Sequence, residues 1–312
     1  MKKYNKVLLF CVTSLYLLSF VRYLDNIDYW IIDILSHFPF QYALISLVLM
    51  SVCLWKKAVL PAVLSGFLVI FNIGTIINVG ETIQASGRTG SAFKVYSANI
   101  YRFNKDFAKL KRDIAKEDPD IVLLIEVTPE NIKQLKPVIR NFPYHIEFTP
   151  VGTLNIGVIF LSKFPVLNYQ TQQMSDLGNV LLEAILDINQ KKVAFYALHY
   201  RNPTYIEGFP VRKKQFLRLA GEVADKAMPV IVAGDFNATP FSPIFRKLLK
   251  ISGLKDSREG FGWQPSWPAS FPPLWIPIDH ILVSPEIQVH NRATGSYTGS
   301  DHYPVLAELS IN

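Results

Sequence analysis

Three long apolar runs lie close together at the start of the chain, and they constrain its fold more than any other feature. They cover residues 7–24, 40–55 and 58–79. At a rise of about 1.5 Å per residue, each is about long enough to cross a hydrocarbon core of roughly 30 Å, the second run being the shortest. Arg22 lies near the end of the first run, where a long basic side chain can reach the interface. We therefore predict that residues 1–80 form a membrane anchor of about three transmembrane helices.

An alternative for the same residues is a cleaved signal peptide followed by a buried helical hairpin. No small-residue cleavage site follows the first run, and Tyr23-Leu24-Asp25 is a poor candidate. The two cysteines, Cys11 and Cys53, both lie inside the apolar runs. The rest of the chain therefore has neither a disulfide framework nor a cysteine metal site.

Charged residues around the apolar runs predict their orientation. The basic residues that precede the first run or separate the second from the third are Lys2, Lys3, Lys6, Lys56 and Lys57. The loop after the first run is acidic and holds Asp25, Asp28 and Asp33. The positive-inside rule puts the basic segments in the cytoplasm. We expect a multi-pass protein of the cytoplasmic membrane, with a polar linker at 81–91 and an extracytoplasmic domain at 92–312.

Residues 92–312 change to short apolar strands interleaved with amphipathic helices. The expected strands are 93–100, 120–127, 155–162, 180–188, 192–199, 229–235, 277–283 and 303–310. The expected helices are 104–117, 129–138, 211–226 and 241–251. This alternation indicates an α/β fold with a mixed sheet, and the paired strands in the middle favour two packed sheets with outer helices.

Several of these strands end in carboxylates, amides or histidines, where α/β enzymes place their chemistry. The residues are Asn99, Glu126, His199, Asp235, Asn237, Asp279, His280, Asp301 and His302. Each one alone has an ordinary explanation as a cap, a turn or a buried structural histidine. Six strand ends of this kind are more than turn chemistry accounts for, so the set predicts an active site.

The order of these residues resembles the endonuclease/exonuclease/phosphatase superfamily. That group includes pancreatic-type deoxyribonucleases, apurinic endonucleases, bacterial sphingomyelinases and inositol polyphosphate 5-phosphatases. The resemblance spans nearly all of residues 93–310, and Gly234-Asp235-Phe236-Asn237 with Ser300-Asp301-His302 is its most specific pair of motifs. It implies a four-layered α/β/β/α sandwich, consistent with the alternation of strands and helices, and metal-dependent hydrolysis of phosphoester bonds.

The resemblance implies a metal site of oxygen ligands. Mg²⁺, or alternatively Mn²⁺, would be bound principally by Glu126, with Asn99 and Asp301 near it. Zinc is less expected, because the set is rich in carboxylates and has no cysteine. Asn99 and Arg201 are candidate substrate contacts, although an exposed arginine in a loop is more often solvated. We interpret His280 as structural, because the adjacent Asp279 is the residue of this pair to which we give the functional role.

The resemblance also implies roles for five catalytic residues. Asp235 would orient or deprotonate the attacking water, and Asn237 would hold the phosphate. His302, oriented by Asp279, would contact the scissile phosphate or assist proton transfer, because a carboxylate fixes the tautomer and raises the basicity of histidine. His199 would donate a hydrogen bond to the charge that develops on the phosphoryl oxygens.

The identity of the substrate stays open at this stage. Of the 32 Lys/Arg and 25 Asp/Glu, seven and four lie in residues 1–91, so the second part carries only about +4, which does not by itself favour nucleic acid. A lipid headgroup gains from a membrane tether, while an extracellular nuclease and a small phosphoester are alternatives. The lipid bilayer is an expected partner, and no obligate protein partner is evident. A non-catalytic binding protein of the same fold is the alternative from another class.

The segment 258–277 interrupts the regular pattern with many Pro and aromatic residues. Its large rings are Trp263, Trp267, Phe271 and Trp275. Three interpretations are open: stacking on a base, insertion among lipid headgroups, or packing as a Pro-stiffened lid.

Overall fold

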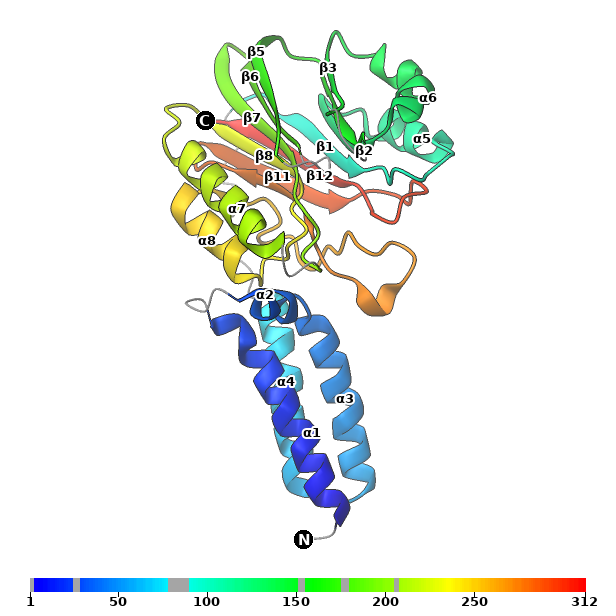
Figure 1. Ribbon diagram of the computed structural model, residues 1–312, viewed down its shortest axis with the longest axis vertical. Coiled ribbons are helices and arrows are strands. Elements are labelled where there is room, and N and C mark those ends of the chain that lie inside the picture. The colour runs from blue at the N-terminus through cyan, green and yellow to red at the C-terminus, as the bar shows by residue number, and fades with distance from the viewer. Residues whose placement is uncertain (1–2, 25–28, 78–89, 151–154, 175–179, 205–207) are drawn as a thin grey trace.

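The computed structural model describes residues 1–312 except 1–2, 25–28, 78–89, 151–154, 175–179 and 205–207. A bundle of long helices, here called the N-terminal bundle, is formed by residues 3–77, and an α/β domain, residues 90–312, sits at one end of it (Figure 1). Most of the expected linker at 81–91 lies outside the described residues.

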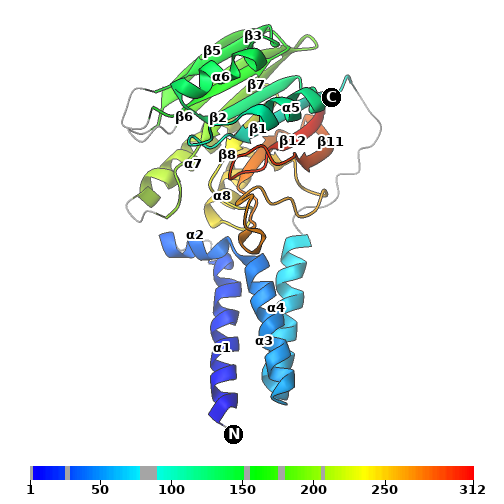
Figure 2. The same cartoon turned by 90° about the vertical axis from the view of Figure 1, so that its right-hand side faces the viewer.

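The N-terminal bundle contains four helices and one short 3₁₀ turn. They are α1 (Lys3–Phe20), η1 (Val21–Tyr23), α2 (Trp30–Ser36), α3 (Pro39–Trp55) and α4 (Val59–Ile77). The segments Tyr4–Tyr23 and Val59–Ile77 are long and apolar enough to cross a membrane. Helices α2 and α3 pass the same test together, as a pair bent by 65°. Figure 2 shows α2 lying across the end of the bundle, between the long helices and the α/β domain.

Packing within the bundle relies on small and polar side chains. Ser46, Ser65 and Asn72 are fully buried, and Asn72 Nδ2 donates to Ser19 Oγ at 2.9 Å. The outer surface is apolar instead, with Phe10 72% exposed and Ile70 74% exposed. Small residues inside and large apolar residues outside are typical of helices that associate within lipid.

The α/β domain is built on two six-stranded mixed sheets. The first has the order β11 (Ile287–Thr294), β12 (Val305–Ile311), β1 (Phe93–Asn99), β2 (Ile121–Val127), β4 (Gly157–Ser162), β3 (Tyr144–Phe148). The second has the order β5 (Val166–Gln173), β6 (Val180–Ile188), β7 (Lys191–His199), β8 (Val230–Asp235), β10 (Asp279–Val283), β9 (Lys255–Asp256). Only the β1–β2 and β7–β8 pairs are parallel.

The two sheets pack face to face, with a pair of helices on each outer side. Successive side chains of a strand point to opposite faces, so Leu123 of β2 lies in the core between the sheets while Leu124 packs toward α5 (Ala108–Glu117) and α6 (Pro129–Ile139). The other sheet packs against α7 (Phe209–Ala224) and α8 (Pro243–Ser252). Figure 1 shows the resulting four layers, which confirm the predicted α/β/β/α sandwich.

All eight expected strands and all four expected helices of this domain are present, with bounds that differ by a few residues. The helix expected at 104–117 begins later, at Ala108, because the side chains of Asn104 and Asp106 accept hydrogen bonds from the backbone N–H groups of Asp106 and Ala108 and form turns there instead. Four strands were not expected, namely β3, β5, β9 and β11. They are the four edge strands of the two sheets.

Helix α2 ties the bundle to the α/β domain through a buried ion pair. The carboxylate of Asp33 pairs with Arg212 of α7 and accepts a hydrogen bond from Ser242, and the side chains of Asp33 and Arg212 are only 3% and 1% exposed. Next to them, His37 Nδ1 accepts from the backbone N–H of Thr239 at 3.2 Å. The same imidazole nitrogen lies 2.9 Å from the Thr239 hydroxyl. The junction is therefore a packed polar interface.

We predict that Asp33→Ala destabilises the full-length protein by about 3–5 kcal/mol, because it leaves Arg212 buried without its partner. Asp225→Ala, at the exposed C-terminal end of α7, is the matched control and should change stability by less than about 0.5 kcal/mol. Thermal unfolding in detergent micelles measures both. Replacing the pair together, as Asp33→Leu with Arg212→Met, should recover part of the loss. Equal stability of Asp33→Ala and the control would show that the ion pair does not hold the junction.

Candidate active site

The register of the strands places the expected catalytic residues side by side. In the second sheet, Asp235 at the end of β8 is the direct neighbour of His199 on β7 and of Asp279 on β10. In the first sheet, Asn99 pairs with Ile125, the residue before Glu126. Asn99 Nδ2 donates to Asp235 Oδ2 at 3.2 Å. This contact joins the two sheets at the site.

Unusual backbone geometry aims three of these side chains. Glu126 lies at a β-bulge between β2 and β4, with φ of 61°, and Asn237 has φ of 49°. Bulges re-aim side chains, and positive φ in a residue other than glycine is a form of strain that clusters at functional sites. Gly234, before Asp235, has φ of 144°, and a Cβ there would lie 1.9 Å from the carbonyl oxygen of Leu198. Glycine is therefore required for Asp235 to occupy its position.

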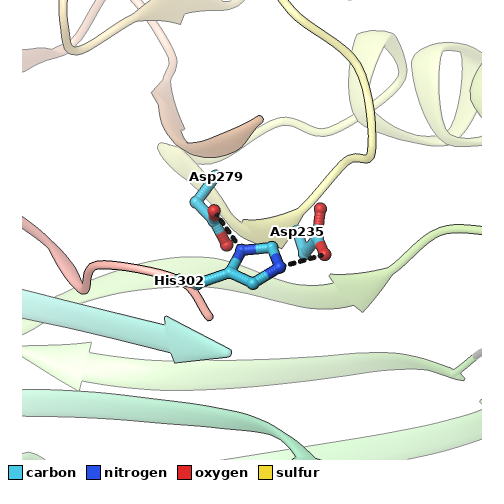
Figure 3. Close-up of side chains that lie close together, drawn as sticks. All are labelled: Asp235, Asp279 and His302. Carbon is cyan, nitrogen blue, oxygen red and sulfur yellow. Dashed lines mark hydrogen bonds and ion pairs between the residues drawn. The ribbon is translucent and has the colours of Figure 1, made fainter. Parts of the chain in front are cut away.

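His302 lies between two buried carboxylates (Figure 3). Its Nδ1 is 2.8 Å from Asp279 Oδ2, and its Nε2 is 3.9 Å from Asp235 Oδ2. Burial opposes the charge on this imidazole, but the carboxylate of Asp279 outweighs burial and raises the pKa of His302 to about 10. Burial, followed by the negative charge of Asp279, raises the pKa of Asp235 to about 6. At neutral pH the cluster thus combines an imidazolium with a carboxylate more basic than usual.

Glu126 and His199 form the more open half of the cluster. His199 Nε2 lies 3.6 Å from Glu126 Oε1 and 3.8 Å from Asp235 Oδ2. Glu126 also accepts hydrogen bonds from Asn99 Nδ2 at 3.1 Å and from the backbone N–H of Arg102 at 3.2 Å. Burial raises the pKa of Glu126, but His199 and then Asn99 reverse this effect, so the pKa is lower than usual. The side chain of Glu126 is 19% exposed, against 2% for that of Asp235.

Two other expected residues have less central contacts. The carboxylate of Asp301 accepts from Trp267 Nε1 at 3.4 Å and lies 3.5 Å from the Ser300 hydroxyl. The side chain of Arg201 lies against Gly208, where an added Cβ would be 3.1 Å from Arg201 Nε. Asp301 is nevertheless close to the cluster, because its negative charge is among the causes that raise the pKa of His302.

His280 and Asn237 have clear hydrogen-bond partners. The buried imidazole of His280 bridges Asp256 Oδ2, at 3.0 Å, and the carbonyl of Ala238, at 2.9 Å. It therefore supports the loop after β8, as expected for a structural histidine. Asn237 Nδ2 donates to the carbonyl of Tyr200 at 2.9 Å and to Asp235 Oδ2 at 3.2 Å. Asn237 therefore fixes the orientation of the Asp235 carboxylate.

Two serines support the site, and sequence reasoning gave neither a role. The hydroxyl of Ser300 donates to the carbonyl of Asn99 at 2.7 Å and accepts from the N–H of His302 at 3.1 Å. Ser266 Oγ accepts from the N–H of Asp279 at 3.1 Å. Ser300 belongs to the Ser-Asp-His motif and was identifiable from it, whereas Ser266 lies in an irregular loop with no motif.

The aromatic loop packs onto the N-terminal bundle. Trp263 stacks near Phe40 of α3, with ring centroids 5.8 Å apart. Gln41 Nε2 donates to the carbonyl oxygens of Pro273 and Trp275 at 3.2 and 3.3 Å. Phe271 is 52% exposed. The contacts of Trp263 and Trp275 thus agree with a loop that packs as a stiff segment. The side chain of Phe271 is instead exposed to solvent or lipid.

The donor atoms of the site fit a divalent metal ion. One oxygen each of Asp235 and Asp279 and one nitrogen of His302 lie within 4.8 Å of one another. Glu126 adds a partly exposed carboxylate, and Asn99 adds an amide whose Oδ1 accepts from the N–H of Tyr101 at 3.0 Å. Carboxylate and amide oxygens are the ligands that hard cations prefer.

Comparison with known proteins agrees with this arrangement. Residues 96–302 match the model of the Endonuclease/Exonuclease/phosphatase family. No curated protein matches the chain. Among solved structures, Danio rerio TDP2 complexed with single-strand DNA product has a TM-score of 0.60 and 20% identity, covering 70% of this chain and 99% of that one.

Two bacterial structures are similar to the same degree. The endonuclease/exonuclease/phosphatase from Bacteroides vulgatus has a TM-score of 0.60 and 18% identity, covering 71% of this chain and 100% of its own. A mannosyl-6-phosphatase of Bacteroides thetaiotaomicron has a TM-score of 0.55 and 20% identity, covering 70% and 100%. Because the family model covers more than half of the chain and the expected residues meet at one site, this protein belongs to the Endonuclease/Exonuclease/phosphatase family, a family of phosphoester hydrolases.

Proposed function

We propose that this protein is a Mg²⁺- or Mn²⁺-dependent hydrolase that cleaves a phosphoester at the outer surface of the cytoplasmic membrane. The observation that carries the proposal is the cluster in which Asp235, Asp279 and His302 meet Glu126 and His199 at the ends of both sheets. The cluster combines a candidate base, a buried cation and a partly open carboxylate, and phosphoester hydrolysis needs all three.

The metal would be held by Glu126, with Asn99 and Asp301 as further ligands. A bound divalent cation supplies Lewis-acid neutralisation of phosphoryl charge. We favour Glu126 over the group of Asp235, Asp279 and His302, because the imidazole of His302 is buried and held by Asp279 at 2.8 Å, whereas the carboxylate of Glu126 is partly exposed. Asn99 would serve as a ligand after a rotation of its amide, since its Nδ2 faces Glu126 here.

Side chains of the protein would carry out the proton transfer and stabilise the charge that develops on the phosphoryl group. Asp235 takes a proton from the attacking water, a role suited to a carboxylate with its pKa raised to about 6. The water oxygen forms a bond to phosphorus while the bond to the leaving oxygen breaks and that oxygen takes the electron pair. His302, kept protonated by Asp279, and His199 donate hydrogen bonds to the phosphoryl oxygens. Asn237 holds Asp235, and it would contact the phosphate only if one of its two amide hydrogen bonds were released. Arg201 is a further candidate for substrate contact.

The position of the site favours a substrate that is part of the membrane. The loop with Trp263 and Trp275 contacts α3 on one side, and Trp267 of the same loop contacts Asp301 at the site. Phe271 and Leu274, 52% and 41% exposed, extend from this loop beside the bundle. A site held this close to the bilayer meets lipid headgroups at high effective concentration. We therefore favour a lipid-borne phosphoester over extracellular nucleic acid.

We predict that Glu126→Gln and His302→Asn abolish most of the metal-dependent hydrolysis of bis-p-nitrophenyl phosphate by the full-length protein. His302→Asn should lower kcat by about 10²–10³-fold, the usual cost of removing a hydrogen-bond donor to the charge that develops in the transition state. EDTA should abolish activity and Mg²⁺ or Mn²⁺ should restore it. Glu147→Gln and His145→Asn, two exposed residues of β3, are the matched controls. Wild-type rates in both site variants would refute the assignment and support a non-catalytic binding protein.

A second prediction concerns the substrate. In nanodiscs, the protein should hydrolyse a phospholipid or lipid phosphoester faster than single-stranded DNA, RNA or soluble inositol phosphates at equal phosphoester concentration. Phe271→Ser should lower the rate with the lipid several-fold and leave the rate with bis-p-nitrophenyl phosphate unchanged, because the side chain is 52% exposed and would enter the headgroup region in the proposed orientation. Faster cleavage of DNA by the wild-type protein would identify a nuclease.

A third prediction concerns topology. The start of α1 and the turn after α3 lie at the same end of the bundle, since the Tyr4 hydroxyl donates to the carbonyl of Lys56 at 3.4 Å, and the α/β domain lies at the other end (Figure 1). Protease added to spheroplasts should therefore digest residues 92–312. A tag at the N-terminus should stay protected until the membrane is opened. Protection of the α/β domain in intact spheroplasts would reverse the proposed orientation.

A further inference from the structure

An open cavity of about 560 Å³ lies at the junction of the N-terminal bundle and the α/β domain, and the proposed reaction does not use it. Its apolar wall is formed by α4, with Ile70, Phe71 and Gly74, and its polar wall includes Arg22, Arg246 and Glu259. Figures 1 and 2 show α8, which carries Arg246, next to the end of the bundle. The cavity thus joins an apolar helix surface to a charged domain surface.

Arg22 brings a buried positive charge to this cavity. The residue is only 3% exposed, and its guanidinium donates to Thr75 Oγ1 and to the Tyr23 hydroxyl. The rings of Tyr23 and Phe71 lie 5.0 and 4.8 Å from it. Within the described part of the chain, no carboxylate forms an ion pair with Arg22, and its buried Nε has no hydrogen-bond partner. A buried cation is normally paired.

A second cation and one anion line the same cavity. Arg246 Nη2 donates to the backbone carbonyl of Arg22, so the two guanidinium groups approach the cavity from neighbouring positions. Glu259 also lines the cavity, and no ion pair of its side chain occurs among the described residues. Asp256 is already bound to His280. Positive charge therefore lies next to α4, and an available carboxylate lies on the α/β domain.

This order of chemical groups matches a phospholipid whose headgroup carries an amine. In such a lipid the acyl chains come first, then the phosphate, then the ammonium group. Ile70, which is 74% exposed, and Phe71 provide the apolar surface for a chain. Arg22 follows at the helix end, where its positive charge would attract a phosphate in the cavity, and Glu259 follows on the α/β domain, where an ammonium would pair with it.

We propose that the cavity between Arg22, Arg246 and Glu259 binds one phospholipid with a phosphate and a primary amine in its headgroup. The lipid fills the junction between bundle and α/β domain and is separate from the substrate. The proposal rests on the placement of the bundle in a membrane, which is part of the proposed function, and it does not depend on hydrolysis.

The test measures thermal stabilisation of the delipidated full-length protein in detergent with EDTA present. Phosphatidylethanolamine should raise Tm more than phosphatidylglycerol, and dioleoylglycerol or inorganic phosphate alone should have little effect. Arg22→Gln should remove the response to both phospholipids. Glu259→Gln should make the two phospholipids equal. Arg218→Gln, an exposed arginine of α7 paired with Glu222, is the matched control and should respond like the wild type.

Gly74→Leu tests the cavity without removing a charge. A Cβ at this position meets no atom within 4 Å, so the new side chain enters the cavity and should abolish the lipid response while the protein stays folded. An equal response to dioleoylglycerol, to inorganic phosphate alone or to phosphatidylglycerol in the wild type would overturn the proposal. So would an unchanged response in Gly74→Leu. The assay of bis-p-nitrophenyl phosphate hydrolysis on the same samples reports separately on the proposed function.

Discussion

The guanidinium of Arg212 joins three parts of the molecule: α7, the N-terminal bundle and the loop after β8. It belongs to α7, it pairs with Asp33 of the N-terminal bundle, and its Nη2 donates to the carbonyl of Asn237 at 2.8 Å. Asn237 in turn donates its backbone N–H to Asp235 Oδ1 at 2.7 Å. Because the ion pair is buried, removing either partner is costly. The orientation of a catalytic carboxylate is thus connected to a helix that precedes the α/β domain in the chain by more than fifty residues.

The pairing of two sheets explains why the cluster needs the whole fold. Neither sheet contains a complete site: the second supplies His199, Asp235 and Asp279, and the first supplies Asn99 and Glu126. The apolar core between them sets their spacing, and the hydrogen bond from Asn99 to Asp235 crosses from one to the other. Burial between the packed sheets is also the largest cause of the raised pKa of Asp235, since charge is poorly solvated there. The packing of the two sheets therefore contributes directly to the acid–base chemistry of Asp235.

The sequence predicted the central strands and the polar residues that cluster at their ends, but not the edge strands or the junction. A strand buried on both faces is a run of apolar residues, as in 121–125, and is easily found. An edge strand such as β5 is mostly exposed and polar, and has no such pattern. The bulge at Glu126 arises where β2 pairs with β4, and a pattern within β2 alone does not predict it. The contact of Asp33 with Arg212 is between residues 179 positions apart, and local pattern does not encode it.

The junction gives a physical reason for an anchor of several helices. A single helix with a flexible linker would keep the α/β domain near the membrane but would let it rotate. Here α2 forms a buried ion pair with α7, α3 contacts the loop that holds Trp263, and Arg246 of α8 donates to the carbonyl of Arg22 in η1. Three contacts at separate points fix a rigid body in orientation as well as distance. The site therefore keeps one angle to the bundle. In the proposed membrane orientation, a headgroup would then be presented to Asp235 and His302 without the entropic cost of aligning the enzyme at each encounter.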